Sequence, residues 1–163
     1  IGLNLAGIGM EGELPSEIGD LSALTTLILS QNTLYGPIPT HVGRLANLTT
    51  LNLHSNALMG TIPGELGSLR ALSNLDLSYN WLEGTIPSTL GNNLFNLYSL
   101  KLQGNNLGGS MPSTICALRR GRLRSLWADC EPNVTSLFAN STPEVLCDET
   151  CCNSCFPRRP NNW

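Results

Sequence analysis

Residues 51–74 read LNLHSNALMGTIPGELGSLRALSN, and copies of this stretch make up most of the chain. The copies begin at regularly spaced leucines, namely Leu3, Leu27, Leu51, Leu75 and Leu100. The first three spacings are 24 residues, the fourth is 25, and a degenerate copy follows 26 residues later at Leu126. A period of roughly 20–29 residues carrying LxLxxNxL predicts a solenoid in which one coil stacks on the next.

Each position of the unit has a structural role. Leu51 and Leu53 are two residues apart, so on a strand both point into the core. Asn56 recurs in the neighbouring copies, and a buried Asn needs a paired amide, so we expect it to bond the backbones of its own and adjacent coils. Pro63 cannot join a hydrogen-bonded ladder, so the chain leaves the strand there. Residues 66–72 then return as a short helical or irregular arc.

The segment NxLxGxIPxxLGxLxxL, present over residues 32–48 and 56–72, resembles the plant-type subclass of extracellular leucine-rich repeats. That subclass includes receptor-kinase ectodomains, receptor-like proteins and inhibitors of cell-wall-degrading enzymes. The resemblance covers residues 1 to about 126. It implies an α/β solenoid: a leucine-rich repeat superhelix with a parallel concave β-sheet and an irregular or 3-10 convex side. A fold of this kind hosts many functions, so the ligand must be argued from the surface.

The sequence divides into a solenoid over residues 1–126, with about five full repeats and a sixth strand, and a cysteine-rich cap over residues 127–163. All six cysteines lie in the last third of the chain: Cys116, Cys130, Cys147, Cys151, Cys152 and Cys155. An even number clustered at one end predicts a disulfide framework with several possible pairings. The alternative is a zinc site, because CxxxCCxxC could supply thiolates. We favour disulfides and expect no metal and no cofactor. The cap resembles those of secreted repeat proteins of diatom-type algae.

Composition narrows the class of partner. Charged residues make up only 13% of the chain, and the formal net charge is −3 with a pI near 5.3. A nucleic-acid-binding surface is usually basic, so we expect no nucleic-acid partner. No apolar run reaches the ~20 residues that a membrane span needs. Three Asn-X-Ser/Thr triplets, at Asn47, Asn133 and Asn140, join the cysteines in predicting a secreted, extracellular glycoprotein.

The two ends of the solenoid carry opposite charges. The first coil departs from the pattern at Ile8 and Met10, and it lacks the cysteine-containing cap that precedes plant-type repeats. Either a cap and a leader are missing, or a partner covers this uncapped N-terminal end. The same coil is acidic, with Glu11, Glu13, Glu17 and Asp20, whereas four arginines follow the fifth coil: Arg119, Arg120, Arg122 and Arg124. Such charge runs are most often solvated, but they could also support head-to-tail self-association or contact an anionic glycan or an acidic protein.

Alternation along the strands leaves small polar residues at the start of the concave face, and aromatic and charged residues towards its C-terminal end. The candidate ligand-binding residues are His54, Asp76, Tyr79, Trp81, Lys101, Gln103, Trp127 and Asp129. Aromatic rings beside directional polar groups suit a peptide, a protein loop or a sugar ring. The structural alternative is that Trp81 folds over the sheet edge and Trp127 packs under the cap.

Ser78, His54 and Asp76 fall on adjacent predicted strands and have the residue types of a catalytic triad. The predicted face is open and flat, with no pocket to exclude water, so we expect no enzymatic activity. An ice-binding surface needs regular Thr or Asn ranks, and the rank begun by Thr26 and Thr50 is not sustained. The sequence therefore favours a secreted or cell-surface recognition module for a protein, peptide or glycan. The alternative is a structural or adhesive protein that self-associates through its ends.

Overall fold

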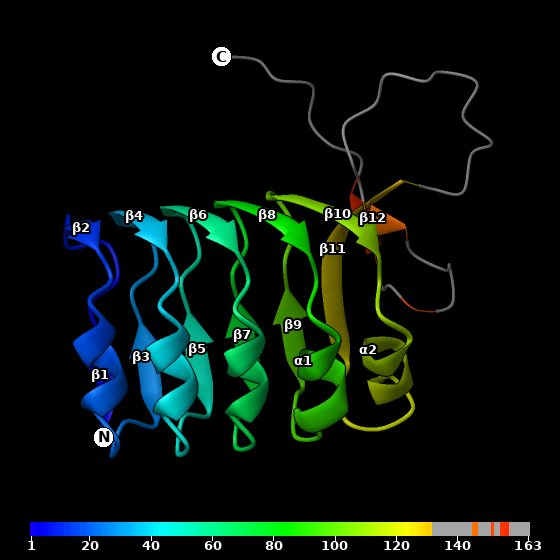
Figure 1. The fold of residues 1–163 in the computed structure, drawn as a ribbon, viewed down its shortest axis with the longest axis horizontal. Helices are drawn as coiled ribbons and strands as arrows, with labels where there is room; N and C mark the ends of the chain where they lie inside the picture. The colour runs from blue at the N-terminus through cyan, green and yellow to red at the C-terminus, as the bar shows by residue number, and fades with distance from the viewer. Residues whose placement is uncertain (132–144, 147–150, 152–153, 157–163) are drawn as a thin grey trace, which may run out of the picture.

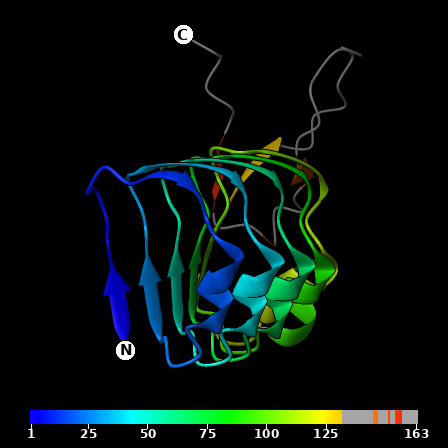
Figure 2. The same ribbon diagram turned by 60° about the vertical axis from the view of Figure 1, so that its left-hand side comes forward.

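The computed structural model describes residues 1–131, 145–146, 151 and 154–156. The chain winds into coils that stack side by side in sequence order (Figure 1). Viewed from the N-terminal end, a coil has three sides: a strand of the concave sheet, a strand of a second sheet, and a short helix (Figure 2). The predicted α/β leucine-rich solenoid is therefore confirmed.

The concave sheet is parallel throughout and puts the repeated leucines in one buried row. Leu27 pairs with Leu51, and the register continues coil by coil to Leu126. These leucines are at most 1% exposed. The strands are β1 (Gly2–Asn4), β3 (Thr26–Ile28), β5 (Thr50–Asn52), β7 (Asn74–Asp76), β9 (Ser99–Lys101) and β11 (Ser125–Glu131), with β13 (Ser154–Phe156) pairing with β11.

A second parallel sheet, which the repeat pattern does not predict, is formed by the segments that follow the recurring asparagines Asn32, Asn56, Asn80 and Asn105. Leu34, Leu58 and Leu82 point inward from it, while the residues next to them are exposed or half-buried. It forms because stacked coils bring equivalent extended segments side by side, where their backbone groups pair. Its strands are β2 (Glu11–Glu13), β4 (Thr33–Pro37), β6 (Ala57–Thr61), β8 (Trp81–Thr85), β10 (Asn106–Ser110) and β12 (Val145–Leu146).

The third side consists of short helices, each preceded by a proline, whose backbone is extended before all of them except the last. Successive helices pack so closely that a Cβ on Gly43 would lie 2.5 Å from the carbonyl oxygen of Glu65. The glycine is therefore needed for coil-to-coil contact. The helices are η1 (Ser16–Asp20), η2 (Thr40–Arg44), η3 (Gly64–Ser68), α1 (Ser88–Asn93) and α2 (Ser113–Leu118), so the 3-10 helices of early coils become α-helices in the longer later coils.

The asparagine ladder has the predicted hydrogen bonds. The side-chain amide of Asn56 donates to the carbonyls of Leu53 in its own coil (3.1 Å) and Leu29 in the preceding one (3.0 Å). Its Oδ1 accepts from the backbone N–H of Leu34 at 3.1 Å. Asn80 and Asn105 repeat this pattern. Each asparagine thus ties two coils together while satisfying its own side-chain amide.

At the C-terminal end of the solenoid, the side chain of Asp129 accepts hydrogen bonds that backbone carbonyls accept in earlier coils. In the fourth coil the N–H groups of Tyr79 and Asn80 donate to carbonyls of the next coil, at 2.8 and 3.2 Å. One coil later, the N–H groups of Gly104 and Asn105 donate instead to Oδ2 of Asp129, at 2.7 and 3.1 Å. Asp129 is a predicted ligand contact. In the structure its carboxylate terminates this row of coil-to-coil backbone hydrogen bonds.

Among the described residues, the disulfide of the predicted framework joins Cys116 of α2 to Cys151. Cys130 lies in β11 and Cys155 in β13, whereas Cys147 and Cys152 lie outside the described residues. The domain boundary at 126/127 remains a prediction, and β11 runs across it. Among the described helices, none has the length and apolar character to cross a membrane.

Candidate ligand-binding face

A hydrogen-bonded network crosses three neighbouring strands of the concave face. Oδ2 of Asp76 is 3.3 Å from Nζ of Lys101 on the next coil, and its Oδ1 accepts a hydrogen bond from the Ser78 hydroxyl. The Ser78 oxygen is in turn 3.0 Å from Nδ1 of His54, and Nε2 of His54 is 3.0 Å from the Ser55 hydroxyl. The structure therefore brings together three of the predicted site residues, His54, Asp76 and Lys101.

The order of this network differs from that of a catalytic triad. Ser78 stands between His54 and Asp76 and is only 1% exposed. Because its hydroxyl donates to Asp76, its oxygen accepts from the Nδ1–H of His54. Within the described residues no carboxylate bonds the imidazole directly, because its ring nitrogens face the hydroxyls of Ser78 and Ser55. The arrangement instead fixes the positions of the His54 ring and the Asp76 carboxylate.

Tyr79 is the exposed aromatic group of this face. Its side chain is 52% exposed, and its ring meets the His54 ring edge to face, with centroids 5.4 Å apart. Its backbone has φ = 54°, in the left-handed region that Ser55 adopts one coil earlier and Gln31 adopts two coils earlier. That region is uncommon for a bulky residue. A tyrosine at such a turn motivates a functional hypothesis for its ring.

Gln103 and Trp127 continue the face towards the C-terminal end. The indole N–H of Trp127 donates to the Ser125 hydroxyl, and Trp127 pairs in register with Lys101. The side-chain oxygen of Gln103 is buried and accepts no hydrogen bond from the residues that the structure describes. Such an atom is rare in folded proteins and calls for an explanation, one of which is a ligand donor.

Trp81 does not lie on the concave face. It begins β8 of the second sheet, where its register partner is Met59. The prediction had placed it at the concave edge, because nothing in a single repeat shows that strand pairing resumes directly after Asn80. A sequence signal for the second sheet does exist. A leucine follows the recurring asparagine by two residues in successive coils, as Leu34, Leu58 and Leu82.

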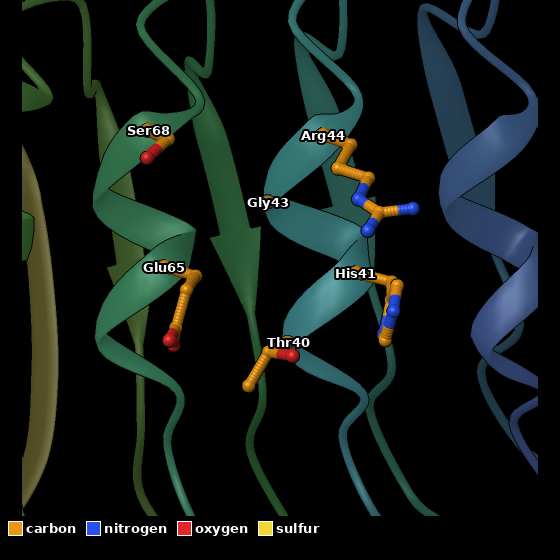
Figure 3. Close-up of a pocket in the computed structure, with 6 residues that line it drawn as sticks. All are labelled: Thr40, His41, Gly43, Arg44, Glu65 and Ser68. Atoms are coloured by element: carbon orange, nitrogen blue, oxygen red, sulfur yellow. The ribbon is translucent and has the colours of Figure 1, made fainter.

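The described residues also form a polar hollow of about 300 Å³ between η2 and η3. In Figure 3, His41 and Arg44 extend from η2 away from Glu65, so the charged groups do not converge. Arg44 is instead 3.7 Å from Asp20 of η1. This hollow is a gap between successive helices and offers no concentrated binding group.

The predicted glycosylation position Asn47 is exposed, in the connection between η2 and β5. Its amide nitrogen donates to the carbonyl of Ser22 at 3.0 Å, and the Thr49 hydroxyl donates to the carbonyl of Thr25 at 2.9 Å. Glycosylation there remains a prediction. Asn133 and Asn140 lie outside the described residues.

Two family models for leucine-rich repeats match the chain, over residues 22–82 and residues 96–118, which together make up just over half of it. The search of curated proteins found no match. Among solved structures, the ectodomain of the receptor kinase SOBIR1 from Arabidopsis thaliana is 34% identical, with a TM-score of 0.69, over 76% of this chain and 66% of that one.

The Arabidopsis receptor kinase HAESA, solved with the peptide hormone IDA and the co-receptor SERK1, is 37% identical with a TM-score of 0.73. The match covers 78% of this chain but only 22% of HAESA. A plant ice-binding protein is 32% identical with a TM-score of 0.71, over 80% of this chain and 43% of that protein. With its repeats, stacked parallel strands and asparagine ladder, the chain belongs to the leucine-rich repeat family, in its plant-type form.

Proposed function

We propose that the chain is an extracellular recognition module that binds a peptide or protein loop at the C-terminal half of its concave face. The observation that carries this proposal is the arrangement of Tyr79, a half-exposed ring held against His54 beside the paired charges of Asp76 and Lys101. Rigid aromatic groups supply contact area at little entropic cost. The network holds the polar groups in place before a ligand arrives, which lowers the cost of binding.

A peptide suits this face better than a sugar ring or a substrate to be cleaved. Asp76 and Lys101 present one acceptor and one donor a few ångströms apart, and these groups match the N–H and C=O groups of an extended backbone. HAESA, a relative of this chain over part of its length, binds a peptide hormone. The enclosed pocket that catalysis would need is not found on this face within the described residues.

The test is a peptide array, with a glycan array beside it, probed with the wild-type protein and a Tyr79→Ala/Lys101→Ala variant. We expect a peptide hit that the double variant loses while its melting temperature stays unchanged. Tyr98→Ala is the matched control, because Tyr98 is also a tyrosine and is 53% exposed. It precedes strand β9, whereas Tyr79 follows strand β7, so the two rings lie at opposite ends of the concave strands. Binding that survives in the double variant, or that falls equally in the control, would overturn the proposed site.

The proposal includes secretion of the protein, a glycan at Asn47 and a C-terminal cap. A disulfide between Cys116 and Cys151 fits an oxidising compartment, which supports a secreted protein with a glycan at Asn47. We place a cap after residue 126 and compare it with the caps of secreted diatom-type algal repeat proteins.

Self-association through the ends is the second candidate function. The acidic residues of the first coil are exposed, and so are Arg120, Arg122 and Arg124 at the other end. A head-to-tail contact between such ends produces open filaments unless it closes into a ring. Sedimentation at low and high salt tests it: salt-dependent growth of the sedimenting species supports assembly, and a monomer at all salt concentrations excludes it.

A further inference from the structure

The outward face of the second sheet carries an apolar stripe made of Tyr35, Pro37, Met59 and Trp81. Strand register joins its members, because Pro37 pairs with Met59 and Met59 pairs with Trp81. Tyr35 lies two residues before Pro37 on β4, and so on the same face. The side chains of Tyr35, Met59 and Trp81 are 44%, 47% and 62% exposed. Three large apolar groups on adjacent strands are thus open to solvent together.

Every charged residue on the strands β2, β4, β6, β8 and β10 is acidic. Glu13 pairs in register with Tyr35, and Glu83 lies two residues after Trp81 on the same face of β8. Strands β2, β4, β6, β8 and β10 contain no lysine or arginine. In the described part of the chain the salt bridges are Arg44–Asp20 and Lys101–Asp76, so neither glutamate has a cationic partner there. The rim therefore carries uncompensated negative charge.

We infer that the apolar stripe is a docking surface for a second protein partner, whose contact surface combines aliphatic side chains with Lys or Arg. Tryptophan, tyrosine and methionine are enriched in the centres of protein interfaces, which polar rims surround. Trp81 beside Glu83 offers a ring face and a carboxylate to one cation, so a guanidinium or ammonium group can use both. Complementary rim charges would also speed association and set its orientation.

This surface is separate from the proposed peptide site. The concave network lies at β5, β7 and β9, whereas the stripe lies on β4, β6 and β8 of the second sheet, which forms another side of the solenoid (Figure 2). A ligand on the concave face and a protein on the second sheet could therefore be held at once. The inference goes beyond the proposed function and does not depend on it.

The test uses two fluorescent synthetic helical peptides, one with a leucine face flanked by arginines and one with glutamates in place of the arginines. We expect the arginine peptide to bind the wild-type chain, and Trp81→Ala to weaken that binding about tenfold. Glu83→Gln should weaken the binding of the arginine peptide less than Trp81→Ala does, and it should make that binding less dependent on salt. Trp81→Tyr should retain most of the affinity, which separates loss of the ring from misfolding.

Two control variants accompany these measurements. Phe95→Ala removes an aromatic side chain that is 68% exposed, in the connection between α1 and β9. Tyr79→Ala tests the concave face. Neither should change the affinity for the arginine peptide.

Three results would overturn the inference. The first is equal binding of the glutamate peptide, and the second is equal weakening by Phe95→Ala. The third is that the arginine peptide does not bind the folded wild-type chain. If a neutral cello-oligosaccharide binds instead and Trp81→Ala removes that binding, the stripe is a glycan platform and the protein-docking inference is wrong.

Discussion

Tyr79 and Gly104 share one space on the concave face: a Cβ added to Gly104 would lie 2.8 Å from Cδ1 of Tyr79. The tyrosine ring rests against the backbone of the next coil on one side and meets the His54 ring, 5.4 Å away between centroids, on the other. Gly104 also has φ = 73°, a conformation that glycine adopts readily. The position of the proposed anchor ring therefore depends on the absence of a side chain at Gly104.

Gly104→Ala should displace Tyr79. We expect a loss of about 2 kcal/mol in the free energy of unfolding, from the left-handed backbone and the steric clash together. Peptide affinity should fall with it, because the ring leaves its position. Urea unfolding and a binding titration on the same sample measure both effects.

Gly9→Ala is the matched control for that substitution. Gly9 has φ = 76°, but a Cβ there meets nothing within 4 Å. It should therefore show the backbone cost alone, with unchanged affinity. Equal losses of stability at positions 9 and 104, with binding retained in both, would show that Gly104 does not position the ring.

Tyr79 occupies a backbone conformation that disfavours any side chain. Tyr79→Gly and Tyr79→Ala both remove the ring, but only alanine keeps the left-handed penalty, so the glycine variant should be about 1 kcal/mol more stable. Both variants should lose the peptide ligand. The same pair at Thr26, in extended β3, should show the opposite order, because glycine weakens a strand interior. An alanine variant as stable as the glycine variant at position 79 would contradict the assigned backbone strain.

Much of the fold follows from the repeat because each coil solves the same packing problem. Leu51, Leu53 and Asn56 take the predicted positions, since a two-residue period and a buried amide each permit few arrangements. The second sheet did not follow from the sequence, because its pairing arises between coils rather than within one.

The candidate site was predicted less completely. His54, Asp76 and Lys101 meet as adjacent strands require. Neither the left-handed turn at Tyr79 nor the capping role of Asp129 could be read from residue types. The turn at Tyr79 depends on backbone angles that most residues avoid. The role of Asp129 depends on its place after the last regular coil.

The asparagine ladder should be the most sensitive polar feature of the solenoid. Asn80 is 5% exposed, and its removal leaves the N–H of Leu58 and the carbonyls of Leu53 and Leu77 without this partner. Asn80→Ala should therefore lower the free energy of unfolding by about 3 kcal/mol. Asn32→Ala should cost less, because Asn32 is only half-buried and lies next to the first coil. Equal losses from the two variants, measured by urea unfolding, would show that burial does not set the cost.

Gln103 tests whether the concave face retains a polar group at the expense of stability. Its buried side-chain oxygen accepts no hydrogen bond from the described part of the chain, so Gln103→Leu should raise the free energy of unfolding by about 1 kcal/mol. The same change should lower peptide affinity if the oxygen serves the ligand, because groups kept for binding are often destabilising. Gln31→Leu, at an exposed position in an earlier coil, should change neither quantity. A Gln103→Leu variant less stable than wild type would mean that the oxygen is hydrogen-bonded in the free protein, and its assignment to the ligand would then be withdrawn.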